Sequence, residues 1–349
     1  MLPEFFKRIE SQLRKELPFV CYRKPGEKTI RAIYQHSNAL ITCPKLDRVG
    51  FVFAPFSKDY ETVLIPRDEV SVASFDKVKA KYKKLKILEA KESGEEAYIE
   101  LIKTAIRNIQ TQNLKKVVLS RAIDLDAKLN ALAVFQNILS TYDNAFCYLW
   151  FHPKIGLWLG ATPELLFSLK NGSLTSMSLA GTMPWDTSEN PSWGAKEKEE
   201  QQLVTAHISN QLENKLEDLE VGPQETVKAG NLWHLKSTIS GTSKTNSLLD
   251  LVCQLHPTPA VCGLPVAEST SFIMRYEGYN REYYAGFLGE IESISPAETS
   301  LFVNLRCLKQ TDTGIKIFVG GGITEKSVPE LEWLETIHKS KTMLNMLRY

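Results

Sequence analysis

The stretch CYLWFHPKIGLWLGATPELLFSLKNGSLTSMSL, residues 147–179, decides the fold class of this chain. Two β-rich runs, CYLWFHP and GLWLGAT, are joined by a short turn, and the runs LLFSLK and SLTSMSL follow closely. Runs of this length that are broken by short turn segments are typical of neighbouring strands. Because a connection of only a few residues joins antiparallel strands, the stretch predicts an antiparallel sheet.

Strands and helices on both sides of this stretch are interleaved without a strict βαβ rhythm. Further strands are expected between residues 29 and 65, at 116–124, and at FLGEIES, TSLFVNLRCL and IKIFVGG. Helices are expected over residues 1–17, 73–112, 130–141, about 195–219 and about 329–347. Ser327 is the expected N-cap of the last helix, with Pro329 in its first turn. The pattern favours an α+β (mixed α/β) fold, with large antiparallel-rich sheets in a sandwich-like core flanked by helices.

The composition excludes several functional classes. The 349 residues include 42 Lys or Arg and 41 Asp or Glu, a formal charge of +1. Binding to nucleic acid or to a membrane surface usually requires a basic excess, so neither is expected, and the basic run at residues 77–86 is interpreted as a solvated helix or loop. The charged N-terminus and the lack of an apolar run of about 18 residues argue against a signal peptide and a membrane span. Six cysteines without metal spacing indicate reduced core residues of a cytoplasmic protein.

Acidic residues on two of the expected helices are candidates for a metal site. Glu332, Glu335 and Lys339 share one face of the last helix through their i, i+3, i+7 spacing, and an exposed face with Glu–Lys pairs is the alternative. On the 195–219 helix, Glu200 extends an apolar stripe by one turn, where it is either partnered in the core or frayed at the helix start. The stripe consists of Val204, Ile208, Leu212, Leu216 and Leu219. Carboxylates from separate helices are what Mg²⁺ requires, with waters or substrate oxygens completing its shell.

Lys116 and Glu164 are candidates for acid–base chemistry. Lys116 begins a predicted strand, where a lysine usually extends to solvent but acts as a base if it is desolvated. Glu164 lies in GATPELLF between apolar residues, which keep a carboxyl protonated and suit a general acid. His234 in NLWHLKS is more often a core histidine than a catalyst. The run Gly320-Gly321-Gly322 indicates either a tight turn or a backbone that an anionic ligand approaches closely.

Ten segments occur in a characteristic order: KVVLSR (116–121), GATPELLF (160–167), LAGT (179–182), KEKEEQQLV (196–204), WHLKS (233–237), LHPTPAVCGLP (255–265), REYYAGFLG (281–289), LRC (305–307), GGGI (320–323) and EWLETIHK (332–339). Together they resemble the chorismate-utilising enzymes, a family that includes isochorismate, salicylate, anthranilate and aminodeoxychorismate synthases. The resemblance implies the anthranilate/aminodeoxychorismate synthase-type fold. It also implies one chorismate-binding catalytic domain over residues 1–349, in which 1–112 form a variable half and 113–349 bear the motifs.

The resemblance implies roles for individual residues. Lys116 matches the lysine that activates water, and Glu164 matches the acid that protonates the departing C4 hydroxyl of chorismate. Glu200 and Glu335 match the carboxylates that bind Mg²⁺, with Glu332 acting directly or through water. The residues that match the groups holding the two carboxylates of chorismate, or that line the same pocket, are Tyr284, Arg306, Lys339, Gly320, Gly321, Gly322, Gly181, Thr182 and His234.

Within the family, the resemblance is closest to the isochorismate synthases. Members that use ammonia typically lack a lysine at the position of Lys116, and LAGT stands where one type of aminodeoxychorismate synthase has PIKGT with a nucleophilic lysine. Salicylate synthases often carry a threonine where this chain has Ala260, so alanine favours an enzyme that stops at isochorismate. A salicylate synthase, an aminating relative and a non-catalytic binder of chorismate are the alternatives.

The resemblance also leads to expectations about the cofactor, the partners and the pathway. The enzyme is expected to require Mg²⁺ and to act on chorismate as a monomer or homodimer, without a glutaminase subunit. Menaquinone biosynthesis is the expected pathway, and siderophore or salicylate biosynthesis stays open as an alternative.

Overall fold

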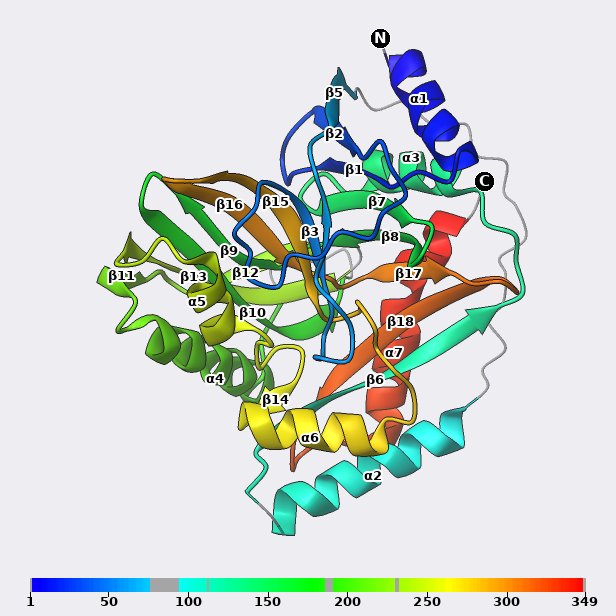
Figure 1. Ribbon diagram of the computed structural model, residues 1–349. Helices are drawn as coiled ribbons and strands as arrows, with labels where there is room; N and C mark the ends of the chain where they lie inside the picture. The colour runs from blue at the N-terminus through cyan, green and yellow to red at the C-terminus, as the bar shows by residue number, and fades with distance from the viewer. Residues whose placement is uncertain (1, 76–93, 112, 186–190, 230–231, 348–349) are drawn as a thin grey trace.

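The computed structural model describes residues 2–75, 94–111, 113–185, 191–229 and 232–347 (Figure 1). Two large sheets face each other, and all strand pairings within the described residues are antiparallel. Helices flank this pair of sheets. The expected α+β fold with antiparallel-rich sheets is therefore confirmed.

Each sheet is formed by strands from distant parts of the chain. The first has the order β14-β6-β18-β17-β8-β7-β1-β2-β5, with bounds β14 Gly263–Leu264, β6 Lys116–Leu125, β18 Ile315–Ile323, β17 Cys307–Gln310, β8 Gly156–Thr162, β7 Phe146–His152, β1 Phe19–Arg23, β2 Thr29–Tyr34 and β5 Glu69–Ser74. The second has the order β11-β13-β10-β9-β16-β15-β3-β4, with bounds β11 Leu216–Val221, β13 Leu232–Ser243, β10 Ser173–Pro184, β9 Leu165–Lys170, β16 Ala297–Val303, β15 Phe287–Ile294, β3 Gly50–Ala54 and β4 Val63–Ile65. A further strand, β12 (Glu225–Ala229), pairs with β13.

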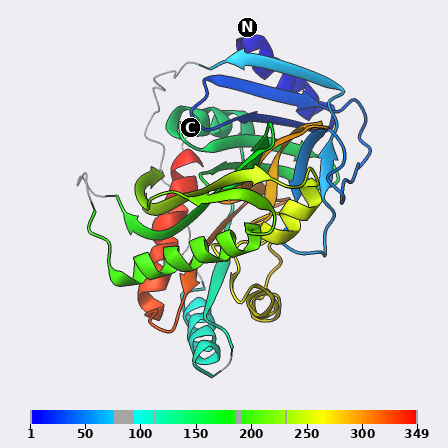
Figure 2. The ribbon, with the colours of Figure 1, turned by 90° about the vertical axis from the view of Figure 1, so that its left-hand side faces the viewer.

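The helices pack on the sheets and on one another. Their bounds are α1 Leu2–Arg14, α2 Glu95–Thr111, α3 Ala131–Thr141, α4 Ala195–Leu212, α5 Leu248–Leu255, α6 Val266–Tyr276 and α7 Pro329–Leu344, followed by the 3₁₀ turn η1 Asn345–Leu347. α1 and α3 pack on the first sheet, α4 packs on β10 and β13 of the second, and α7 packs on β18. In the view of Figure 2, α4 passes in front of α7, and Figure 1 shows that the two helices lie apart. In the described part of the chain, no helix is both long and apolar enough to span a membrane.

Aromatic side chains fill the space between the two sheets. Phe53 of β3 stacks on Tyr283 with ring centroids 4.4 Å apart and lies 4.7 Å from Trp150 of β7. Phe146 of β7 stacks on Phe302 of β16 at 4.3 Å. All five side chains are buried. Because burying a large apolar side chain contributes about 1.5–3 kcal/mol, this cluster is a main source of the stability of the fold.

The expected helix over residues 195–219 is confirmed as far as Leu212 and is wrong beyond it. α4 ends at Leu212, and Leu216 and Leu219 belong to the strand β11. Leu216 is buried there and pairs with Ser243 of β13. An apolar residue every fourth position satisfied the helical pattern, but pairing with β13 decided the local structure.

Two other expected helix starts are also corrected. Within the described part of residues 73–112, the one helix is α2, and the residues up to Ser74 belong to the strand β5. Residues 76–93, which include the basic run, lie outside the described residues. Ser327 does not cap α7: the N-cap is Val328, and the Ser327 hydroxyl accepts the Thr324 N–H at 3.1 Å instead. Pro329 lies in the first turn as expected.

A buried ion pair connects α6 to β6. Arg281 donates to both carboxylate oxygens of Glu277 at 2.6 Å and to the carbonyls of Val261 and Val118 at 2.8 and 2.7 Å. Glu277 also accepts from the backbone and hydroxyl of Ser120 at 2.6 and 2.8 Å. Both charged groups are almost completely shielded from solvent, so the pair depends on this full set of hydrogen bonds.

Arg281→Leu is expected to lower the free energy of unfolding by about 3–5 kcal/mol, because it leaves the Glu277 carboxylate buried without its cationic partner. Urea denaturation measures this change. Arg14→Leu is the matched control: Arg14 pairs with Glu10 on the exposed surface of α1, so its loss should change stability by less than about 0.5 kcal/mol. A loss below about 1 kcal/mol in Arg281→Leu contradicts the assigned importance of the buried pair.

Candidate active site

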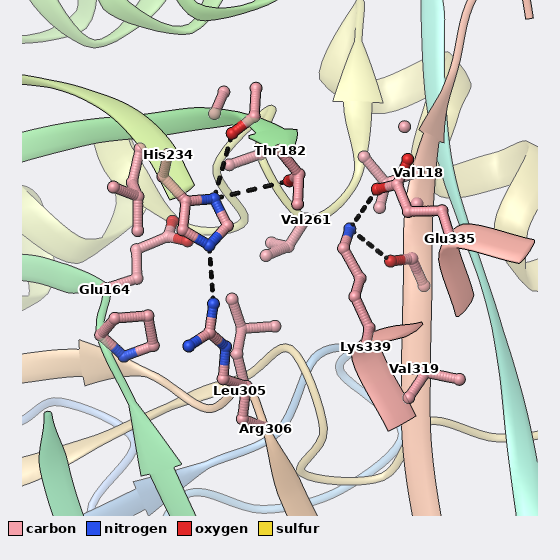
Figure 3. Close-up of a pocket in the computed structure, with 18 of the residues that line it drawn as sticks. Val118, Glu164, Thr182, His234, Val261, Leu305, Arg306, Val319, Glu335 and Lys339 are labelled. Atoms are coloured by element: carbon pink, nitrogen blue, oxygen red, sulfur yellow. Dashed lines mark hydrogen bonds and ion pairs between the residues drawn. The ribbon is translucent and has the colours of Figure 1, made fainter. Parts of the chain in front are cut away.

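A cavity of about 140 Å³ lies between β6, β18, β10, β13, α4 and α7. A cavity of about 150 Å³ can bind benzene, so a space of this size fits a small molecule with one ring. All predicted site residues except Glu332 line it, namely Lys116, Glu164, Gly181, Thr182, Glu200, His234, Ala260, Tyr284, Arg306, Gly320, Gly321, Gly322, Glu335 and Lys339. Figure 3 shows several of them around the cavity.

Lys116 stands at the first position of β6 and points into the protein. Its side chain is 1% exposed, and its Nζ lies 2.7 Å from Oε1 of Glu200 on α4. The common alternative for such a lysine, extension to solvent, is therefore wrong, and so is a frayed position for Glu200. A Cβ at Gly322 would lie 2.6 Å from Glu200 Oε1 and 2.9 Å from Lys116 Cε, so only glycine leaves room for this ion pair.

Gly320, Gly321 and Gly322 do not form a turn. They belong to β18 and pair with Ser120, Leu119 and Val118 of β6, so the tight-turn interpretation is wrong. β17 pairs with β18 only at Ile315–Ile317. Along the glycines, β6 is thus the only strand neighbour within the described residues, and the opposite backbone edge faces Lys339, which donates to the Gly320 carbonyl at 2.9 Å.

Glu164 lies in the short connection between β8 and β9 and is 4% exposed. Burial raises the pKa of its carboxyl to about 7, against the opposing effects of a hydrogen bond from Thr258 and of the positive charges of Lys116 and Arg306. The apolar residues on both sides of Glu164 in the sequence already indicated this burial. A carboxyl with such a pKa can hold a proton near neutral pH and release it to a ligand.

His234 and Arg306 form a hydrogen-bonded pair on another wall of the cavity (Figure 3). Arg306 donates to His234 Nε2 at 2.7 Å, so Nε2 is an acceptor, and Nδ1 carries the proton that faces the Gly181 carbonyl at 3.0 Å. Burial, and then the charge of Arg306, lower the pKa of His234 well below its usual range. The core interpretation of His234 therefore fits its hydrogen bonds, and the residue lines the cavity as well.

The α7 residues divide between cavity and interior. Lys339 Nζ lies 2.7 Å from Glu335 Oε1, and both side chains are partly exposed at the cavity (Figure 3). Glu332 is buried and is not part of the cavity lining. Its carboxylate nevertheless lies near that of Glu335, because a Cβ added at Gly321 would be 3.6 Å from Glu332 Oε2 and 3.7 Å from Glu335 Oε1. The Glu–Lys pair of the alternative exposed face thus exists, but it faces the cavity.

Sequence reasoning missed Glu197, which lines the cavity one turn before Glu200 on α4. Its signal was available, because Glu197 and Glu200 have the same i, i+3 spacing as Glu332 and Glu335. Glu197 also packs against Gly181, which has φ +71° at an irregularity of β10 and whose added Cβ would lie 3.2 Å from Glu197 Cβ. The apolar wall, also missed, includes Val118, Leu179, Val261, Leu305, Phe318, Val319 and Met343.

The acidic residues fit a magnesium ion by their chemistry, although not in the side-chain positions described here. Carboxylate oxygens are the ligands that Mg²⁺ prefers, and it needs only one or two of them besides water and substrate oxygens. Glu200 and Glu335 both line the cavity, and the glycine backbone leaves space beside them. Each is now held by a lysine, and within the described residues no three acidic, His or Cys side chains are grouped closely enough to hold a metal.

Comparisons with known proteins were made for the whole chain. The family described as "Chorismate binding enzyme" matches residues 58–348. Isochorismate synthase EntC from Escherichia coli (strain K12) is 31% identical over 261 residues, which cover 71% of this chain and 66% of EntC, just under two thirds of its length. The crystal structure of DhbC from Bacillus anthracis has a TM-score of 0.81 at 23% identity and covers 97% of this chain and 99% of that chain. Anthranilate synthase component I from Streptococcus pneumoniae TIGR4 has a TM-score of 0.69 at 16% identity, over 94% of this chain and 92% of that chain.

These comparisons agree with the expectations from the motifs. The family match contains every residue that lines the cavity, and the two solved structures share the fold, including the anthranilate synthase type that the motifs implied. The chain belongs to the chorismate-binding enzyme family.

Proposed function

We propose that the chain is an isochorismate synthase, which moves a hydroxyl group of chorismate from C4 to C2. One observation carries this proposal: a buried lysine and a buried carboxyl whose pKa lies at about 7, Lys116 and Glu164, line the same cavity. The similarity to EntC supports the same activity. The cavity also contains the cationic side chains of Arg306 and Lys339, which suit a substrate with two carboxylates.

The two residues supply complementary halves of the reaction. Water is a poor nucleophile, so Lys116, as the neutral amine, takes its proton as the water oxygen bonds to C2. The ring double bonds shift, the C4–O bond breaks, and Glu164 protonates the departing hydroxyl, which leaves as water. Substrate and product therefore have the same atoms, and Lys116 and Glu164 exchange their protons with solvent to complete the cycle. Since each step is reversible, the same pair also catalyses the return reaction.

The identity of the nucleophile and the product distinguish this proposal from its alternatives. The lysine at position 116 favours water over ammonia, and LAGT provides no nucleophilic lysine at residues 179–182. Ala260 lines the cavity, which supports the expectation that this alanine favours release of isochorismate over formation of salicylate. The pathway that uses isochorismate, with menaquinone biosynthesis as the expected one, stays a prediction.

We also propose that catalysis requires Mg²⁺, held by Glu200 and Glu335, with Glu332 acting directly or through water. Bound Mg²⁺ would neutralise the ring carboxylate of chorismate. Lys116 and Lys339 contact Oε1 of these two carboxylates at 2.7 Å, so the ion would share the carboxylates with the lysines or replace them. Both lysines line the same cavity as the carboxylates.

Purified protein incubated with chorismate and MgCl₂ should form isochorismate with at most traces of salicylate, as resolved by chromatography. Lys116→Gln should reduce turnover by about 10²–10⁴-fold, because it removes the base, while chorismate binding measured by calorimetry is largely retained. Lys326→Gln, at an exposed lysine, is the matched control and should keep wild-type turnover. Undiminished turnover in Lys116→Gln removes Lys116 from the mechanism, and abundant salicylate from the wild type identifies a salicylate synthase instead.

Glu164→Gln should make stability less sensitive to pH. The carboxyl titrates near 4.5 when unfolded and at about 7 when folded, so the folded state binds more protons between these values. Wild-type stability should therefore fall relative to Glu164→Gln as the pH rises from about 4.5 to above 7, by a total on the order of 3 kcal/mol. Urea denaturation across this range measures the difference, and Glu325→Gln, at an exposed carboxyl, should show none. A pH-independent difference would contradict the raised pKa.

Glu200→Gln and Glu335→Gln should each weaken Mg²⁺ binding by more than about tenfold in calorimetry with chorismate present, because each removes a charged oxygen ligand from a shell that has few of them. Glu332→Gln should have a milder effect if its contact runs through water. Glu199→Gln changes the neighbouring residue on α4, whose carboxylate is exposed, and should leave the affinity unchanged. Unchanged affinity in all three site variants would refute the assigned metal ligands.

A further inference from the structure

Thr258 is a buried residue beside the cavity to which neither the motifs nor the comparisons assign a role. It follows α5 by three residues and is 4% exposed. Its backbone carbonyl accepts the N–H groups of Val261 and Cys262 at 3.0 Å each, which forms the turn that presents Ala260 and Val261 to the cavity. The backbone of Thr258 is therefore fixed by this turn independently of its side chain.

The side chain of Thr258 reaches the other wall of the site. Its hydroxyl donates to Oε1 of Glu164 at 3.4 Å. A buried hydroxyl requires a hydrogen-bond partner, and a carboxyl oxygen is a strong acceptor. Thr258 does not line the cavity itself, so it can affect a bound ligand only through Glu164.

A carboxylic acid carries a single proton, and the two oxygens of Glu164 are not equivalent in this environment. While Thr258 donates to Oε1, that oxygen acts as an acceptor, and the proton of the neutral acid resides on Oε2. Resting on the function proposed above, we propose that Thr258 is a positioning residue that orients the general acid by keeping its proton on Oε2 for the departing hydroxyl. The expected consequence is a loss of catalytic rate, rather than of substrate affinity, when the hydroxyl is removed.

The groups around Glu164 determine the pKa of its carboxyl. Burial disfavours the ionised carboxyl most, whereas Lys116 on β6 and Arg306 before β17 are positively charged and favour it. Tyr284 before β15 also faces Glu164, whose negative charge contributes to the raised pKa of the Tyr284 hydroxyl. The Thr258 hydroxyl is a further group that favours ionisation. Removing it should therefore raise the pKa of Glu164 while the charged neighbours stay in place.

Thr258→Val tests this role, because valine keeps the shape and the backbone carbonyl of the turn and removes only the hydroxyl. The ionisation of Glu164 is followed by infrared spectroscopy, through the protonated-carboxyl band that Glu164→Gln abolishes. In Thr258→Val the midpoint of this band should rise by about 0.5–1 pH unit. kcat for chorismate should fall by about 10–100-fold while KM stays within about twofold.

Two variants separate a positioning role from a structural one. Thr258→Ser retains the hydroxyl and should restore both the infrared midpoint and kcat. Thr299→Val removes an equally buried threonine hydroxyl that donates to the Glu290 carbonyl at 2.8 Å, remote from the cavity, and should resemble the wild type in both measurements. Thr258→Ala, which also lacks the hydroxyl, carries the same expectation if the valine variant does not fold.

The outcomes are distinct. An unchanged midpoint in Thr258→Val, or a fall in kcat that serine does not rescue, overturns the positioning role. A raised midpoint together with a wild type that does not convert chorismate supports the contact between Thr258 and Glu164 and refutes the proposed function instead.

Discussion

The hydrogen-bonded ladder between β6 and β18 is the constraint on which the site depends. It pairs Val117–Leu125 of one strand with Ile315–Ile323 of the other and places Val118 opposite Gly322. Because Gly322 has no side chain, the space beside it is open to the Glu200 carboxylate and the Lys116 amine, which contact each other there. α4 packs on the second sheet and Lys116 belongs to the first, so this ion pair connects the two sheets across the cavity.

The buried ionisable groups of the cavity are stabilised in two different ways. Lys116 and Lys339 each pair with a carboxylate, an arrangement that compensates part of the cost of removing charge from water. Glu164 and His234 instead tend towards their neutral forms, because burial raises the pKa of the first and lowers that of the second. The cavity thus contains a carboxyl, Glu164, that can keep its proton near neutral pH and act as a proton donor. The aromatic core between the sheets supplies the stability that such a polar site lacks.

Both the fold class and most of the cavity lining could be predicted from the sequence. The two predictions rested on different signals. Short β-rich runs with short turns are local signals, and they correctly indicated β7 to β10. The lining residues followed from ordered motifs, since no local pattern brings Lys116 to Glu200. Two errors occurred where partners distant in sequence decide the structure: Leu216 pairs with β13 rather than extending α4, and the Gly320–Gly322 run pairs with β6 rather than turning. Thr258 was missed for the same reason, because 94 positions separate it from Glu164.

The charges that line the cavity also bear on the proposed metal. When Lys116 acts as the base it is a neutral amine, so Lys339 and Arg306 are the cationic side chains that line the cavity. Besides Glu164, whose pKa lies at about 7, the carboxylates of Glu197, Glu200 and Glu335 line it as well. The two carboxylates of bound chorismate would therefore add to an excess of negative charge. An uncompensated buried charge is costly, and a divalent cation would offset much of this excess. The balance supports the Mg²⁺ proposal on grounds that are independent of the ligand positions.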